Sequence, residues 1–175
     1  TAGATGNLTL TDNVNLAPPG QERSDLVLGV SVPLGLRGQG SHLKLEADYI
    51  PTIYAYARQK ESDNLQNNLR SLMTVEAVDK FFFVDASANI YQSFISPFVA
   101  RPASGASVTQ NRTQQTTLGL SPYIRSESNR GWTYLVRNDN LWNTYSASGL
   151  GSSLTNSLTA KFESLARQLR GYTER

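Results

Sequence analysis

Residues 26–36 read Leu-Val-Leu-Gly-Val-Ser-Val-Pro-Leu-Gly-Leu, with a large aliphatic side chain at every second position. A period of two places these side chains on one face of a β-strand, whereas a helix would scatter them around its axis. The intervening positions hold small residues together with Val27 and Pro33. Because proline has no N–H to donate to a neighbouring strand, the pattern predicts a bulge or a local break in pairing at Pro33.

The same alternation recurs along the whole chain and predicts an all-β protein. Apolar and polar positions alternate in eight predicted strands, which lie near residues 8–16, 26–36, 43–49, 70–77, 82–90, 117–125, 132–139 and 154–163. A ninth strand is expected to begin near Leu169. No internal boundary is visible, so we expect one domain over residues 1–175.

The connections between these strands alternate in length. The long ones are expected at 17–24, 59–64, 96–112 and 146–152, and the short ones at 37–40, 78–80, 127–131 and about 165–167. Outer-membrane barrels have short periplasmic turns and longer outer loops, whereas Greek-key sandwiches have no reason for strict alternation. The sequence therefore predicts an antiparallel up-and-down transmembrane β-barrel.

Composition excludes several other classes of protein. Charged residues make up 17% of the 175 residues, the net charge is +2 and there are no cysteines. These values exclude a coiled coil, a disulfide scaffold and the strong positive charge of a nucleic-acid-binding domain. No apolar run approaches the ~20 residues of a transmembrane helix.

Charged residues of the predicted strands share the polar positions. These residues are Lys44, Glu46, Asp48, Arg70, Glu76, Asp85, Arg125, Arg137, Lys161 and Glu163. We predict that they face the barrel lumen, because a charge on the lipid side is costly. The water face of a soluble sandwich would produce the same pattern. The two signs are balanced, so the sequence predicts a weakly selective lumen that suits uncharged solutes such as sugars.

Aromatic residues cluster at both ends of the strands and suggest the two interfacial girdles of a barrel. One group follows short connections and the other precedes long ones: Phe81, Phe82, Phe83, Trp132 and Tyr134, then Tyr54, Tyr56, Tyr91, Phe94, Trp142 and Tyr145. The alternative is that aromatic residues simply favour strands.

Residues with catalytic or metal-binding chemistry are few. The single histidine, His42, has no serine placed beside it by the sequence, so we expect no enzyme activity. Five residues carry oxygen atoms that a hard cation accepts: Asp12, Asn13, Asn15, Asp139 and Asn140. Their spacing matches no EF-hand, and Asp and Asn more often form turns at strand ends. We therefore expect no metal and no cofactor.

Four strings carry a resemblance to a known family. They are Thr11-Asp-Asn-Val-Asn-Leu-Ala-Pro-Pro-Gly20, Phe83-Val-Asp-Ala-Ser-Ala88, Gln92-Ser-Phe-Ile-Ser-Pro-Phe98 and Leu120-Ser-Pro-Tyr-Ile-Arg125. The chain resembles the outer-membrane β-barrel family associated with PEP-CTERM/exosortase systems of Gram-negative bacteria. The resemblance implies a porin-like outer-membrane barrel in a setting of exopolysaccharide and surface-protein export. Members of that family are longer, so we expect this chain to be the N-terminal part of a longer barrel.

Three functional hypotheses remain at this point. The first is a non-enzymatic outer-membrane channel or scaffold that contacts outer-membrane lipid, a saccharide or an export-machinery protein, and that can oligomerise. The second is a soluble or fibrillar β-rich surface adhesin or biofilm-matrix protein, which would not need detergent for extraction. The third is a barrel enzyme acting on lipid or peptide, although His42 is expected at the end opposite the long loops.

Overall fold

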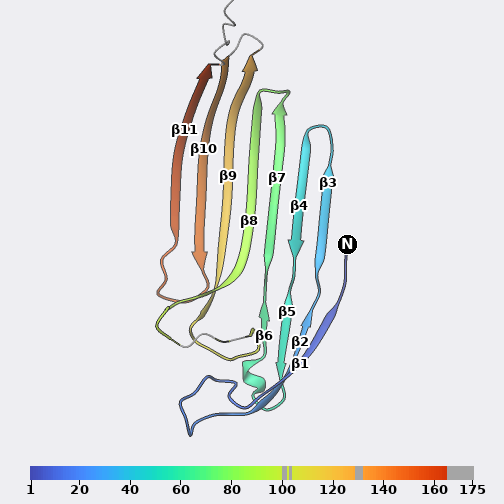
Figure 1. The fold of residues 1–175 in the computed structure, drawn as a ribbon, viewed down its shortest axis with the longest axis vertical. Coiled ribbons are helices and arrows are strands. Elements are labelled where there is room, and N and C mark those ends of the chain that lie inside the picture. The colour runs from blue at the N-terminus through green and yellow to red at the C-terminus, as the bar shows by residue number, and fades with distance from the viewer. Residues whose placement is uncertain (100–101, 103, 129–131, 165–175) are drawn as a thin grey trace, which may run out of the picture.

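The computed structural model describes residues 1–99, 102, 104–128 and 132–164. These residues form antiparallel strands and one 3₁₀ turn, η1 (Lys60–Ser62) (Figure 1). The strands are β1 (Thr5–Thr11), β2 (Asp25–Ser31), β3 (Leu34–Gln39), β4 (Leu43–Tyr49), β5 (Thr52–Tyr56), β6 (Asn64–Gln66), β7 (Leu69–Val78), β8 (Phe82–Phe94), β9 (Arg112–Ser128), β10 (Trp132–Tyr145) and β11 (Ser153–Ser164). Across these ranges, no helix has the length and apolar character needed to span a membrane.

The strands follow one another as a simple antiparallel meander. One sheet has the order β11-β10-β9-β8-β7-β4-β3, and a smaller one the order β1-β2-β5-β6. The two sheets lie end to end, because β2 leads directly into β3, β4 into β5 and β6 into β7 (Figure 1). Counted as continuous strands, these elements confirm the eight predicted strands. The expected ninth strand near Leu169 lies outside the described residues.

A line of local breaks crosses three neighbouring strands and divides the two sheets. The breaks fall at residues 32–33, 50–51 and 67–68. Pro33 and Pro51 have no N–H to donate, so the regular ladder stops at both. Bridging bonds persist across the line: the Val32 N–H donates to the Pro51 carbonyl at 3.1 Å, and Ile50 and Asn68 exchange bonds of 2.7 and 3.2 Å. The break predicted at Pro33 is confirmed, and Pro51 extends it to the next strand.

The first strand ends earlier than predicted. Pairing with β2 stops at Thr11, although the sequence suggested a strand to residue 16. The Asn13 side chain turns the chain instead: its Nδ2 donates to the Ala17 carbonyl at 2.7 Å, and its Oδ1 accepts the Ala17 N–H at 2.8 Å. An asparagine side chain that replaces a backbone partner in this way favours a turn over a strand.

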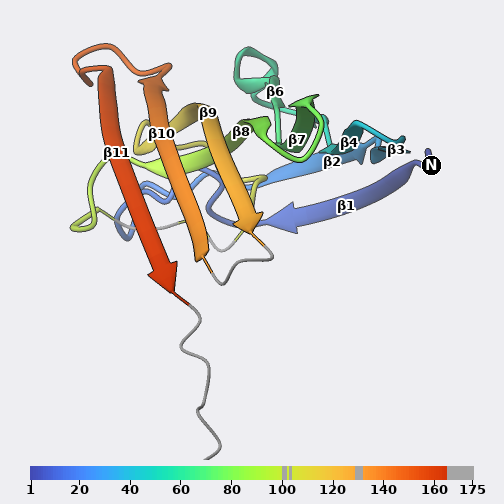
Figure 2. The same cartoon turned by 90° about the horizontal axis from the view of Figure 1, so that it is seen from above.

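The sheet is open in the described part of the chain. The strands follow one open arc when seen from above, with β11 and β3 at opposite ends (Figure 2). In the described residues, the ladder partner of β11 is β10 and that of β1 is β2, so β1 and β11 do not pair. A closed barrel is therefore not found in the described residues, and the predicted transmembrane barrel stays unconfirmed.

The cross-strand register separates an apolar face from a polar face. Residues directly opposite each other share a face, and the row Leu45, Met73, Ala86 and Leu120 runs through consecutive pairs. The apolar face also carries Leu28, Val30, Leu43, Val84, Leu118 and Leu158. The ten charged residues that the sequence placed together all lie on the polar face. The predicted two-face pattern is confirmed.

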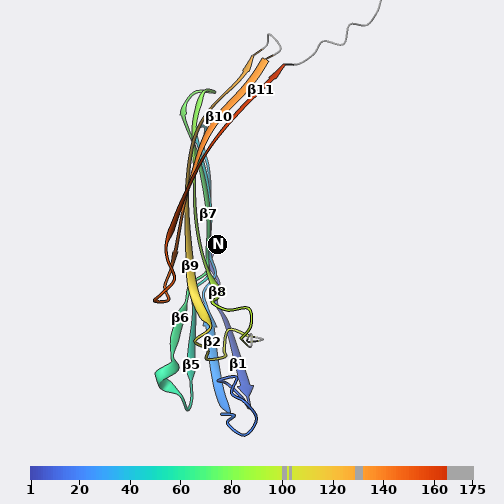
Figure 3. The same cartoon turned by 90° about the vertical axis from the view of Figure 1, so that its left-hand side faces the viewer.

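The apolar face has no covering layer within the described chain. Edge-on, the molecule is one sheet thick over most of its length (Figure 3). Large side chains on this face are widely exposed, including Leu36 at 58% and Leu158 at 71%. Among the residues that the structure describes, the buried hydrophobic ones are Val14, Val27, Tyr56, Phe83 and Ala106. A soluble sandwich would instead bury such a face against a second sheet.

A small core forms on the polar face near the long connections. Val27 of β2 is 1% exposed, and it contacts Val14 from segment 12–24 and Ala106 from segment 95–111. The Tyr56 hydroxyl donates to the Ala106 carbonyl at 2.8 Å, and the Val108 N–H donates to the Val14 carbonyl at 2.8 Å. Val14, Ala106 and Val108 are therefore packed against the polar face of the smaller sheet.

Replacement of Tyr56 by phenylalanine tests this attachment. The variant loses one buried hydrogen bond and leaves the Ala106 carbonyl unpaired, which should destabilise the loop packing by about 1 kcal/mol. We expect faster hydrogen exchange of the amides around Ala106. The matched control is Tyr54→Phe, because the Tyr54 hydroxyl has no hydrogen-bond partner in the described residues. Equal exchange in both variants would contradict the role of the Tyr56 hydroxyl.

Candidate functional site

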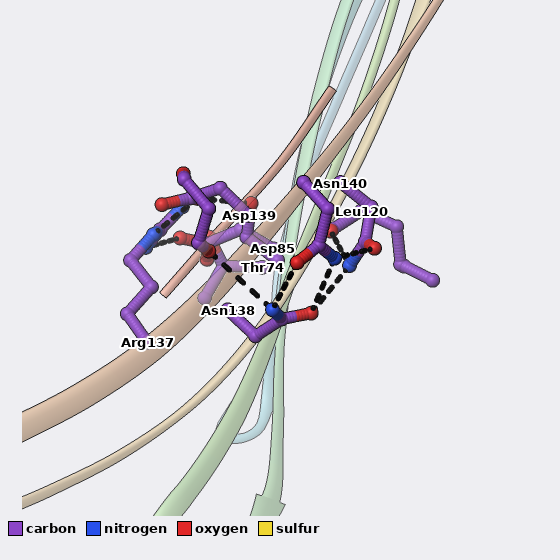
Figure 4. A network of polar contacts seen from close by, with 10 residues as sticks. Thr74, Asp85, Leu120, Arg137, Asn138, Asp139 and Asn140 are labelled. Atoms are coloured by element: carbon purple, nitrogen blue, oxygen red, sulfur yellow. Dashed lines mark hydrogen bonds and ion pairs between the residues drawn. The ribbon is translucent and has the colours of Figure 1, made fainter. Parts of the chain in front are cut away.

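The polar face carries a charge network centred on Arg137 of β10. The Arg137 Nη1 lies 2.7 Å from Asp85 Oδ2 on β8, and its Nε lies 2.7 Å from Asp139 Oδ1 (Figure 4). Ser121 donates to Asp139 at 2.6 Å, and Thr74 donates to Asp85 at 2.8 Å. One guanidinium therefore joins two carboxylates, and the network crosses β7 to β10 with nearly balanced charge.

Aromatic rings extend this network toward the short-connection end. Phe83 and Tyr123 stack with their centroids 5.1 Å apart. Arg125 lies 4.5 Å from the Phe83 centroid and Arg137 lies 5.0 Å from that of Tyr123. Both are cation–π distances. The sequence suggested Phe83 for a lipid-facing girdle, but it is 5% exposed and points to the polar face.

Two further aromatic residues of the expected girdles face inward. Tyr54 and Tyr56 are packed in the small core of the long segments. Gly105 lies so close to the Tyr54 hydroxyl that any Cβ at position 105 would overlap it. Trp132 and Trp142, in contrast, share the apolar face, where they are 63% and 38% exposed. Phe82 also shares the apolar face, because it lies two residues before Val84 on β8. Whether these aromatic residues form interfacial girdles stays a prediction.

Three asparagines interrupt the apolar face at the hairpin of β10 and β11. Asn140 donates to Asn138 at 2.7 Å, and Asn156 donates to Asn140 at 2.6 Å. Asn140 also donates to the Leu120 carbonyl at 3.2 Å (Figure 4). The alternation of Trp132, Tyr134 and Val136, continued along β10, places Asn138 and Asn140 on this face. The mutual bonds lower the cost of these carboxamides on an apolar surface.

The residues suggested as cation ligands do not form one site. Asp139 and Asn140 lie on opposite faces of β10, and the Asn13 amide is used in its own turn. Within the described ranges, the group able to hold a metal ion is His42, Glu76 and Asp79 near two short connections. His42 Nδ1 lies 3.7 Å from Glu76 Oε2. His42 and Asp79 are exposed members of this group.

Asp25, at the long-connection end of β2, anchors the turn after β5. It is 1% exposed, and it accepts the backbone N–H groups of Leu26 at 2.7 Å, Arg58 at 3.0 Å and Gln59 at 3.1 Å. Burial opposes ionisation, but these hydrogen bonds and the Arg58 guanidinium hold the pKa of Asp25 below its usual value. The ionised carboxylate thus holds the turn after β5 in place.

A cavity of about 410 Å³ lies between β6 and β8. Its walls come from β6, β8, the start of β9, the segment 107–109 and Ser146. The lining residues are Asn64, Leu65, Gln66, Gln92, Ser107, Val108, Thr109, Arg112, Gln114 and Ser146. No local sequence pattern predicts this cavity, because it forms where β6 and β8, which pair with other strands, move apart.

Comparisons with known proteins add no assignment: no family model, no curated protein and no solved structure matches this chain.

Replacement of Arg137 by methionine tests the polar network. It retains most of the side-chain stem but leaves Asp85 and Asp139 without their shared cation. We expect the free energy of unfolding in urea to fall by roughly 1–2 kcal/mol, because the residues are only half-buried. Arg125→Met, which removes a cation–π contact, should cost about 0.5–1 kcal/mol. The role of Arg137 as the centre of the network would be contradicted by an equal or larger loss in the Arg125 variant.

Proposed function

We propose that this chain forms part of the wall of an outer-membrane β-barrel that acts as a weakly selective channel or a scaffold. The observation that carries the proposal is the apolar face, which runs across all the strands and has no covering layer in the described residues. Lipid covers such a face without a second protein layer. The alternation of long and short connections supports the same reading.

The polar face suits the lumen of such a barrel. The ten charged residues named from the sequence have both signs, and Arg137 sits between Asp85 and Asp139 instead of in a ring of one sign. A channel with this wall would discriminate weakly between ions. Val14, Ala106 and Val108 pack against this face, and the described residues around them would narrow one mouth. On the resemblance described above, we propose that this channel takes part in the export of exopolysaccharide or surface proteins.

The apolar face also carries features suited to a membrane interface. Trp132 and Phe162 are largely exposed at the short-connection end, and Trp142 is partly exposed nearer the other end. Aromatic side chains favour both bilayer interfaces. Three asparagines are polar residues on this apolar face, and they form hydrogen bonds with one another: Asn138, Asn140 and Asn156.

A second candidate function is a fibrillar surface adhesin or biofilm-matrix protein. It is favoured by the open edges at β1 and β11, which can pair with strands of other copies. We propose a non-catalytic role in either case, because His42 pairs with Glu76 at the end away from the cavity. An adhesin would be released from cells by salt or denaturant, whereas a barrel requires detergent.

The channel proposal is tested by conductance of the full-length protein in a planar bilayer. We expect stepwise conductance with weak preference between potassium and chloride, because the polar face balances its charges. Strong selectivity for either ion would contradict the balanced lumen. Detergent extraction without any conductance would favour the scaffold, and extraction without detergent would favour the adhesin.

A further inference from the structure

The cavity near the long connections exists because two adjacent strands diverge. Pairing between β7 and β8 begins at Leu69 and Ile90, and β6, which precedes β7 in the same strand, does not pair with β8. The space left between β6 and β8 is closed by residues 107–109. Val108 is held there by its bond to Val14 and by the small core beneath it. The cavity is therefore supported by the fold on each of its sides.

The lining of this cavity is mainly neutral and polar. Side-chain amides and hydroxyls predominate, with the apolar side chain of Val108 and the single charged residue Arg112. Leu65 also lines the cavity, but it lies opposite Ile53 in the ladder and shares the apolar face. Amides and hydroxyls both donate and accept hydrogen bonds. A surface of this kind matches a ligand that offers hydroxyl groups in several directions, and small apolar areas match the C–H faces of a sugar ring.

Several of these polar groups are free to bind a ligand. In the part of the chain that the structure describes, the Gln92 carboxamide and the Ser107 hydroxyl have no hydrogen-bond partner. Other lining groups are partly used: Gln66 donates to the Gly105 carbonyl at 3.1 Å, and the Gln114 Oε1 accepts from Asn67 at 3.1 Å. The cavity thus contains polar side chains that internal hydrogen bonds hold in place, and polar side chains that have no partner in the described residues.

Arg112 adds one positive charge to this neutral lining. Its guanidinium donates to the Gly105 carbonyl at 3.0 Å and to the Ser104 carbonyl at 3.3 Å. Five N–H donors are present on a guanidinium, so others remain for a ligand. No carboxylate pairs with Arg112 among the described residues, and none lines the cavity. The charge is therefore available to an anionic group.

We propose that this cavity binds a saccharide that carries a carboxylate, such as a hexuronate unit. Sugar hydroxyls would bond to Gln92, Ser107 and their neighbours, and the carboxylate would bind Arg112. Arginine is well suited to carboxylates because its parallel N–H groups match the two oxygens. The volume of about 410 Å³ lies in the range of small-molecule sites, which is roughly 300–1,000 Å³. A single cation is too little to hold a polyanion such as a nucleic acid.

The inference deepens the proposed function and rests on it for the route by which a saccharide would reach the site. Binding measured in detergent, without a membrane, separates the two. A protein that binds the saccharide but does not conduct leaves the site intact and refutes the channel. A protein that conducts but does not bind refutes the site alone.

Calorimetric titration of the full chain with digalacturonate and with neutral digalactose tests the site. We expect digalacturonate to bind about tenfold more tightly, in line with one charge-assisted pair. Gln92→Leu and Ser107→Ala should each weaken both ligands by roughly 2–10-fold, since each removes a neutral hydrogen bond that the fold does not use. Gln115→Leu, a neighbouring glutamine that does not line the cavity, should leave both affinities unchanged.

Two further titrations complete the test. Arg112→Lys keeps the charge but not the paired N–H geometry, and it should reduce the preference for digalacturonate while digalactose affinity stays similar. Inorganic phosphate should bind far more weakly than digalacturonate. The proposal is overturned if neither saccharide binds, if both bind equally, if phosphate matches digalacturonate, or if Gln115→Leu weakens binding as much as Gln92→Leu.

Discussion

The arrangement of this protein depends on the removal from water of a large apolar face. The alternation of side chains along every strand gathers leucine, valine and isoleucine on one side of a single-layered sheet. A few buried residues near the long connections cannot balance that exposure, because burial of apolar surface is the main favourable term in folding. Lipid or another protein must therefore cover the face for the sheet to persist, and lipid explains the loop asymmetry and the paired charges of the opposite face as well.

On the opposite, polar face, charged and polar groups are accommodated in two ways. Toward the short connections, its charges pair with one another, as Arg137 does with Asp85 and Asp139. Toward the long connections, Val14, Ala106 and Val108 pack on it and create the small core around Val27. The line of breaks at Pro33 and Pro51 lies between these two regions. The chain thus combines a regular sheet with an irregular region near the long connections, and the cavity lies in that region.

Much of this arrangement was predictable from the sequence, because period-two alternation is a local signal. The strands, the break at Pro33 and the common face of the ten charged residues all follow from it. Features that depend on contacts between distant segments did not follow. No pattern in the sequence around Tyr56 predicts its hydrogen bond to Ala106. The cavity lining likewise brings residues 64–66 together with residues 107–114, which are far apart in the sequence. Phe83 was assigned to the wrong face because its aromatic character was given more weight than its odd-numbered position on β8. Whether the charged residues line a lumen stays a prediction.

Spin labels along β9 give the most direct test of the claim that lipid covers the apolar face. The chain has no cysteine, so single cysteines can be introduced and labelled without background. In vesicles containing the full-length protein, labels at Leu118 and Leu120 should be accessible to dissolved oxygen and shielded from a water-soluble nickel complex. Labels at Thr117 and Ser121 should show the reverse. Similar accessibility to the nickel complex at all four positions would contradict the account.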